Sequence, residues 1–417
     1  MESAPQTCAP ARPGSTVGSA LLIIPKNSPT TARFWEKAHL PSSRGFFMPG
    51  ALPPGDSQPL DQVGQAPPAQ SSPGGPLKRA FSFLRRHPIL CLLLLTPGIP
   101  EYLSSSSPLY AIVLNPAQFV FQLTANFGLY GPGVLLIREA MIRWNKGWAT
   151  VLLLGAAYGI LEEGVALSTL FDPKASPVGQ LGYFGHWAGV SWIWSATIIP
   201  VHMLFSISIP ILLLGLALPS TRGRSLLSPR GIKVVVVILV ADVASLMLLI
   251  IYGEHFWMGD PVFVASLAAI AFLVWLARRA PSDVPLGRTS SPGASPRRMA
   301  ILGIIFYPSA LLVNGIGMSE GAPALVVLLL VILAQGLFLV YVLRVAGSSN
   351  NEPQVIALSF GLIVPIAAIG LIATITVPAA LVGDLVMVLF FRMLWRRYRV
   401  GPRALVAQEA GERGKGL

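Results

Sequence analysis

Residues 155–206 read GAAYGILEEGVALSTLFDPKASPVGQLGYFGHWAGVSWIWSATIIPVHMLFS. Two apolar runs in this stretch flank a connection rich in glycine and aromatic residues. The first run contains Glu162 and Glu163, and the second contains His202. The connection itself contains His186. Apolar runs of about 20 residues are typical of helices that cross a bilayer. Acids and imidazoles inside such helices are costly, so they indicate a functional site.

The composition of the whole chain agrees with a membrane protein. Of its 417 residues 53% are hydrophobic and 12% are charged, whereas soluble domains carry about 25% charged residues. The net charge of +12 comes from basic clusters between apolar runs, which is the pattern that orients membrane helices. We therefore expect the lipid bilayer as partner and no binding of nucleic acid. Cys8 and Cys91 have no metal-ligand spacing.

Ten apolar segments predict an all-α fold, a polytopic bundle of about ten transmembrane helices. The segments cover roughly residues 88–107, 117–141, 147–169, 188–218, 231–252, 260–277, 299–318, 322–344, 354–374 and 376–395. Basic residues follow every second segment, which places both termini in the cytoplasm and the protein in the cell membrane. Pro97, Gly98 and Pro100 interrupt the first segment and predict a broken or re-entrant helix there.

The regions outside the apolar segments predict the domain organisation. Residues 1–84 are rich in Pro, Ser and Gly and are expected to form a disordered cytoplasmic tail. Residues 85–279 then carry the first six segments. A basic cytoplasmic linker follows at 280–298, the last four segments lie within 299–396, and 397–417 form a polar cytoplasmic tail.

The depths of the acidic pair and of His202 predict that they meet. At about 1.5 Å per residue, both lie roughly 13–15 Å from the outer end of their helices. Successive helical residues diverge by about 100°, so only one of the two glutamates is expected to face the site directly. Gly155 and Gly159 share a helix face with Glu163, and small residues favour close packing of helices. Glu163 is therefore expected to be the glutamate that faces the site.

Two further residues are expected near this site. His186 is expected above the acidic pair, at the mouth of the site. Glu101 follows the break in the first segment and is expected to reach the same region.

Three chemical roles remain open for Glu162, Glu163, His186 and His202. A carboxylate beside an imidazole can act as a general base on water, which predicts a membrane-embedded hydrolase. The same side chains can instead hold a divalent metal ion. A buried Glu–His pair can also serve only to fix helix packing.

Other polar residues support a transporter as the alternative. Asp242 and Asp384 lie near the middle of their predicted helices, where isolated acids suit a proton or cation path. A non-catalytic structural membrane protein is the third class. Glu139 and Arg143 are four residues apart near the inner end of their segment, and a salt bridge between them is expected.

The order of these motifs resembles the CPBP membrane peptidases, which include CAAX-processing and bacteriocin-immunity proteases. The matching residues in this chain are Glu162 and Glu163, Phe184 with His186, and His202 with Ser206. The resemblance implies that the glutamates and histidines activate water within the membrane. Leu167 stands where the family motif EExxxR has its arginine.

The chain also looks like uncharacterised prokaryotic multi-pass membrane proteins. The strings that carry this likeness are PEYLSSS at 100–106, LIRE at 136–139, YGILEEG at 158–164 and GVSW at 189–192. This second resemblance implies a membrane family and no particular activity.

Overall fold

The computed structural model describes residues 83–106, 122, 126–282, 295–346, 352–373 and 379–399. The predicted N-terminal tail, apart from its last two residues, lies outside the described residues. So do most of the 280–298 linker and the C-terminal tail from residue 400 onward. The disorder predicted for the N-terminal tail therefore stays a prediction.

The described residues are helical almost throughout, which confirms the all-α class. In chain order the elements are α2 (Pro88–Pro97), η1 (Gly98–Tyr102), η2 (Asn126–Tyr130), α5 (Gly131–Arg143), α6 (Trp148–Gly159), η3 (Ile160–Ala166), η4 (Gly179–Gly182), β1 (His186–Trp187), β2 (Val190–Ser191), α7 (Trp192–Val201), η5 (His202–Ser208), α8 (Ile209–Ala217), η6 (Pro219–Thr221), α9 (Pro229–Gly253), α10 (Asp260–Arg279), α11 (Pro296–Ser319), α12 (Ala324–Ala346), α13 (Glu352–Ala373) and α14 (Ala379–Arg399). Strands β1 and β2 pair antiparallel in a short hairpin.

Seven helical stretches among the described residues are long and apolar enough to cross a membrane. They are Trp148–Ala166, Trp192–Ala217, Pro229–Gly253, Asp260–Arg279, Pro296–Ser319, Ala324–Val342 and Glu352–Ile372. The first predicted segment forms the shorter apolar helix Pro88–Tyr102, which ends in the π-helical turn η1 after its prolines. The chain is thus a multi-pass membrane protein, and the count of ten spans stays a prediction.

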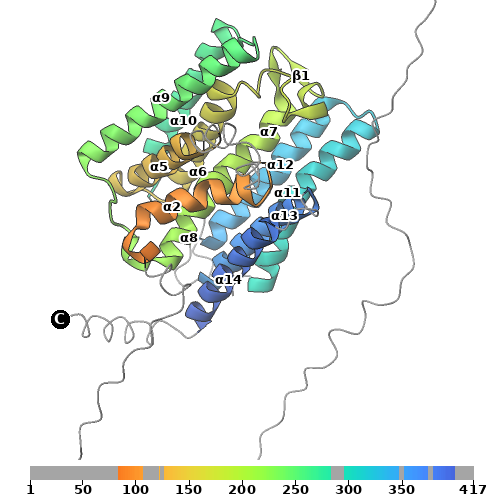
Figure 1. The fold of residues 1–417 in the computed structure, drawn as a ribbon. Helices are drawn as coiled ribbons and strands as arrows, with labels where there is room; N and C mark the ends of the chain where they lie inside the picture. Colours follow the sequence, from red (N-terminus) through yellow and green to blue (C-terminus); the bar gives the residue numbers. More distant parts are fainter. Residues whose placement is uncertain are drawn as a thin grey trace, which may run out of the picture. The chain divides into compact units, whose positions relative to one another are not determined.

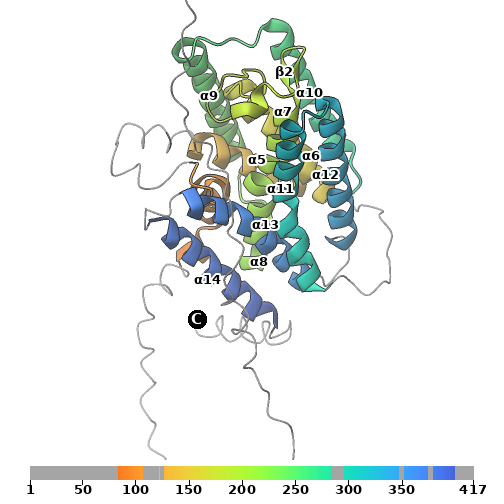
Figure 2. The same cartoon turned by 90° about the vertical axis from the view of Figure 1, so that its right-hand side faces the viewer.

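The helices form a centre with two flanks (Figure 1 and Figure 2). Helices α5 and α6 pack together in the centre, and α6 also packs along η5. On one flank α9 contacts α5, and α10 contacts α6. On the other flank α11 packs against both α12 and α13, and α13 packs against α14. Helices α9 and α10 expose apolar side chains such as Val237 and Phe272, as expected of helices that face lipid.

Connections predicted to lie on the same side of the membrane meet at the same end of the bundle. At one end Lys146 Nζ donates to the carbonyl of Ala280 at 2.7 Å, and Arg222 lies 3.5 Å from Glu352. We call this the basic end. At the opposite end, Phe171 from the connection after η3 packs with Met258 from the connection after α9. The alternation of the ten predicted segments and the cytoplasmic assignment of the basic end both stay predictions.

Four π-helical turns, η1, η2, η3 and η5, interrupt the regular helices of the described chain. Proline or glycine adjoins each of them, as Pro97 precedes η1, Gly131 follows η2, Gly159 precedes η3 and Pro200 lies just before η5. Such residues weaken the regular i→i−4 hydrogen bonding and allow the wider turn. The four turns converge, since η1 contacts η5 and side chains link η1 to η2 and η3 to η5.

Candidate functional site

His202, the first residue of η5, lies between the two adjacent glutamates of η3. Its Nε2 atom is 2.7 Å from Oε1 of Glu163, and its Nδ1 atom is 2.8 Å from Oε2 of Glu162. All three side chains are buried, with exposed fractions of 1% for Glu162, 7% for Glu163 and 3% for His202. We call these three residues the Glu–His–Glu cluster. The contact expected from their matched depths is present.

The expectation that only one glutamate faces the site is wrong. Both carboxylates reach His202 because the imidazole ring presents a nitrogen atom to each of them. The π-helical turn also changes the angle between neighbouring side chains from its value in a regular helix. The glycine face remains as expected, since Cβ atoms at Gly155 and Gly159 would press against the backbone of Met203 and Ile199.

Hydrogen bonds from two other side chains hold the cluster, and a third side chain supports one of these two. The hydroxyl of Thr169 donates to Oε2 of Glu163, and Nε1 of Trp194 donates to Thr169 at 3.3 Å. Ser206, one turn after His202, lies 3.1 Å from the Nδ1 atom of the imidazole. The contact of Nδ1 with Ser206 has the geometry of a hydrogen bond. The contact of Nδ1 with Glu162 is short, but its angles are unfavourable for a hydrogen bond.

Two tyrosines flank the imidazole. The rings of Tyr130 and Tyr158 lie 6.1 and 6.5 Å from that of His202, measured between centroids. The Tyr130 hydroxyl donates to Oε1 of Glu101 at 2.5 Å, so Glu101 does reach this region from the interrupted first helix. A polar network built from η1, η2, η3 and η5 thus lies inside the apolar bundle.

Not every polar atom of this network has a hydrogen-bond partner among the described residues. Oε2 of Glu162 and the hydroxyl of Tyr158 are buried without a well-directed hydrogen bond. Tyr158 precedes Glu162 by four residues, so both lie on the same face of the α6–η3 helix. Unpartnered polar atoms are rare in protein interiors and often mark a catalytic role or a bound water molecule.

The cluster does not fit a divalent-metal site. A metal ligand needs a free imidazole nitrogen, and here each ring nitrogen already lies 2.7–2.8 Å from a carboxylate oxygen. The described residues also contain no group of three or more His, Cys, Asp or Glu side chains that could hold a metal ion.

His186 lies apart from the cluster in its hydrogen bonding. It belongs to the β1–β2 hairpin, and its Nδ1 atom pairs with the hydroxyl of Ser191 at 3.0 Å. Ser191 in turn donates to the carbonyl of Gly182, so the pair fastens the connection between η3 and α7. The structure thus gives His186 a visible role in the hairpin.

The two acids of the transporter alternative lie on different helices. Asp242 on α9 stands against Gly128, where a Cβ atom would come within 2.7 Å of the carboxylate, and its Oδ2 atom is buried without a partner. Asp242 also lies within electrostatic range of Tyr158. Asp384 is half-buried on α14. Among the described side chains, no hydrogen bond or ion pair links Asp384 to the Glu–His–Glu cluster.

A second buried polar group lies at the basic end. Glu139 pairs with Arg143 at 3.0 Å, which confirms the expected salt bridge. Glu139 also accepts from the backbone of Leu226 at 2.6 Å, while Arg138 donates to the carbonyls of Thr221 and Arg224. This group binds the connection between α8 and α9 and accounts for the LIRE string as a structural feature.

Several residues of the site were not expected from the sequence. Tyr158 and Thr169 could have been found by their spacing, since Tyr158 is one turn before Glu162 and Thr169 follows the end of η3. Tyr130 gave no such signal, because its place beside His202 depends on the packing of separate helices.

Comparison with known proteins yields a family without an assigned activity. A family model described as an uncharacterized membrane protein family matches residues 90–401. No curated protein and no solved structure matches the chain significantly.

Proposed function

This chain belongs to an uncharacterized membrane protein family, and we propose that it is a membrane-embedded hydrolase whose catalytic group is the Glu–His–Glu cluster. The observation that carries the proposal is the buried imidazole of His202 within hydrogen-bonding distance of two carboxylates. An imidazole between two acids can pass a proton from one to the other, which is what activation of a water molecule requires.

Each residue of the cluster has a role in this proposal. Water binds between Oε2 of Glu162 and the hydroxyl of Tyr158, neither of which makes a well-directed hydrogen bond. Glu162 takes a proton from the water molecule as the water oxygen attacks the carbonyl carbon of the substrate. His202 stabilises the carboxyl group of Glu162, which later returns the proton to the leaving group. Glu163, fixed by Thr169, keeps His202 in place. The resemblance to CPBP peptidases favours a peptide bond as the bond that is hydrolysed.

The depth of the cluster requires movement of the helices. Glu162 is 1% exposed, so substrate and water reach it only when the neighbouring helices separate. The four converging π-helical turns are suited to this, since such turns are weak points of helices and occur often at functional sites.

Incorporation of heavy oxygen tests the proposal without knowledge of the substrate. The purified protein is incubated in H₂¹⁸O with membrane lipids and peptides, and the products are examined by mass spectrometry. We expect ¹⁸O in a product of the unaltered chain and a loss of about a hundredfold or more in Glu162→Gln and His202→Ala. Asp384→Asn serves as the control and should keep the activity. Equal incorporation by all four proteins would refute the proposal.

A proton-coupled transporter is the second candidate, and Asp242 favours it. Its buried, unpartnered carboxylate oxygen near Tyr158 is the kind of group that takes up and releases a proton within a membrane. Proton flux into proteoliposomes, measured with an entrapped pH dye, tests this reading. Flux that is lost in Asp242→Asn, without any ¹⁸O incorporation, would favour transport. If both activities were absent and the variants changed stability alone, the structural class would stand.

A further inference from the structure

A cavity of about 490 Å³ lies at the basic end, and none of the three residues of the Glu–His–Glu cluster lines it. Residues of α5, α6, η5, α8, α12 and α13 form its walls. Its walls are mainly aliphatic, and they include Leu152, Leu204, Leu212, Leu339 and Leu362. This volume falls in the range of about 300–1,000 Å³ that is usual for ligand sites. An apolar space of this kind inside a membrane bundle suits a hydrocarbon chain.

The charged residues of the cavity are predominantly cationic. Of the residues that line it, Arg138, Lys146 and Arg222 carry positive charge and Glu352 carries negative charge. Arg138 is occupied by the connection between α8 and α9, as described above. Lys146 donates to one carbonyl, that of Ala280, and an ammonium group has three hydrogen atoms to donate. Lys146 and Arg222 therefore remain able to bind an anion.

The ion pair of Arg222 is weak enough to exchange its partner. Its Nη1 atom lies 3.5 Å from Oε1 of Glu352, and both side chains are more than a third exposed. The Nε atom of Arg222 donates to the carbonyl of Gly215 at 2.8 Å and Nη2 donates to the hydroxyl of Tyr398 at 2.9 Å. Exposed ion pairs of this kind contribute little to stability, because water screens them. A phosphate group can take the place of the Glu352 carboxylate at Nη1, while the bonds to Gly215 and Tyr398 hold the guanidinium in position.

We propose that this cavity binds an anionic phospholipid, with one acyl chain between α6, α8 and α13 and the phosphate at Lys146 and Arg222. The aliphatic walls account for the chain, and the two cations at the end of the helices account for the headgroup. Basic residues at this depth attract anionic headgroups. The occupant comes from the leaflet at the basic end, and the site is separate from the proposed hydrolase site.

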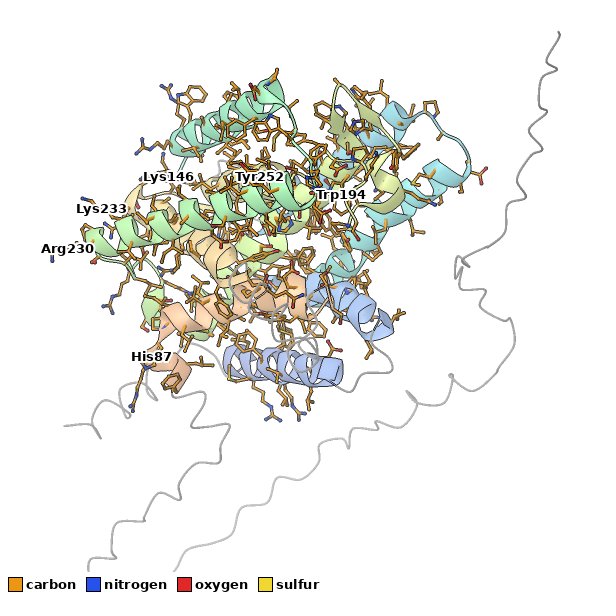
Figure 3. The ribbon with its side chains drawn as sticks, turned by 45° about the horizontal axis from the view of Figure 1, so that its top comes forward. His87, Lys146, Trp194, Arg230, Lys233 and Tyr252 are labelled. Atoms are coloured by element: carbon orange, nitrogen blue, oxygen red, sulfur yellow. The ribbon has the colours of Figure 1, made fainter. Side chains whose placement is uncertain are left out.

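Native mass spectrometry of the delipidated full chain measures this binding directly. Phosphatidylglycerol and phosphatidylcholine with the same acyl chains are titrated separately. We expect phosphatidylglycerol to bind about tenfold more tightly. The double variant Lys146→Ala, Arg222→Ala should lose that preference. Arg230→Ala, Lys233→Ala is the matched control, since both of these residues project from the same end of α9 outside the cavity (Figure 3).

Two further variants separate the proposal from simple damage to the fold. Glu352→Gln removes the competing carboxylate and should strengthen phosphatidylglycerol binding severalfold, a gain that a misfolded protein does not show. Leu212→Trp fills the cavity and should abolish binding of both lipids, whereas Leu329→Trp on the exposed face of α12 should not. Equal binding of the two lipids, or unchanged binding to Leu212→Trp, would overturn the proposal.

Discussion

At the scale of single residues, His202 contacts both of two adjacent glutamates and so links them in one cluster. Helix rise along the sequence is enough to predict that Glu162, Glu163 and His202 lie at the same depth. It is not enough to predict that both carboxylates touch the ring, because that depends on the π-helical turn and on the orientation of the imidazole. The partner of His186 could not be predicted from depth either, because Ser191 reaches it only when the β1–β2 hairpin forms.

Thr169→Val tests how strongly the cluster depends on its surroundings. The substitution keeps the shape of the side chain, but it removes the donor to Glu163 and the acceptor for Trp194. Two buried polar groups then lose a partner, so the free energy of unfolding should fall by about 1 kcal/mol. Hydrolysis, as measured by ¹⁸O incorporation, should fall with it because Glu163 is no longer fixed.

The control for this prediction is Ser245→Ala on α9. Ser245 is exposed, and its hydroxyl bonds only to the carbonyl of Ala241 in the same helix. Thermal unfolding of the two variants in the same detergent gives the comparison. If Thr169→Val unfolds at the same temperature as Ser245→Ala and keeps full activity, Thr169 does not position Glu163.

At the scale of elements, the sequence predicts where the helices lie along the chain. It predicts only some of the π-helical turns that interrupt them. Pro97, Gly98 and Pro100 correctly predict an interruption of the first helix. The turns η3 and η5 were not predicted, although Gly159 and Pro200 adjoin them. Proline and glycine mark where a helix can deform, whereas the form that the deformation takes is decided by contacts with other helices.

The packing of α11 on α13 gives a prediction at this scale. A Cβ atom at Gly361 would press against the carbonyl of Ala300, and one at Gly303 would lie 2.6 Å from the carbonyl of Leu358. Gly361→Ala should therefore force the two helices apart and lower the free energy of unfolding by about 1–3 kcal/mol. The measurement is the thermal unfolding temperature of the purified protein.

Gly336→Ala on α12 is the matched control, since nothing lies within 4 Å of a Cβ atom at that position. Alanine favours a helix over glycine by up to about 1 kcal/mol, so this variant should be as stable as the unaltered chain or slightly more stable. Equal stability of the Gly361 and Gly336 variants would contradict the close packing of α11 and α13.

At the scale of the whole molecule, hydropathy predicts the all-α membrane class. It succeeds because a bilayer imposes a fixed length of apolar residues on each helix that crosses it. It does not predict which helices are neighbours, such as α6 beside α10 or α11 beside α13. Those contacts depend on the shapes of the side chains, as at Gly361. The order of apolar segments along the chain carries no information about those shapes.

Sidedness is the prediction that belongs to the whole chain. Single cysteines are placed in a background without Cys8 and Cys91, one at Ser176 near the hairpin and one at Arg230 at the basic end, both exposed. A maleimide that cannot cross membranes should label Ser176→Cys in intact cells. It should label Arg230→Cys only after the membrane is opened, because basic connections face the cytoplasm. Labelling in the reverse order would contradict this orientation.

The central claim is that Glu162 and His202 act together in hydrolysis, and a double-mutant cycle on the rate of ¹⁸O incorporation tests it most directly. The rates of Glu162→Gln, His202→Ala and the variant with both changes are compared with that of the unaltered chain. Residues that act as a unit lose most of their effect with the first substitution. We predict that the double variant is no slower than the slower single variant. Losses that multiply, or a rate unchanged in all three variants, would contradict the account.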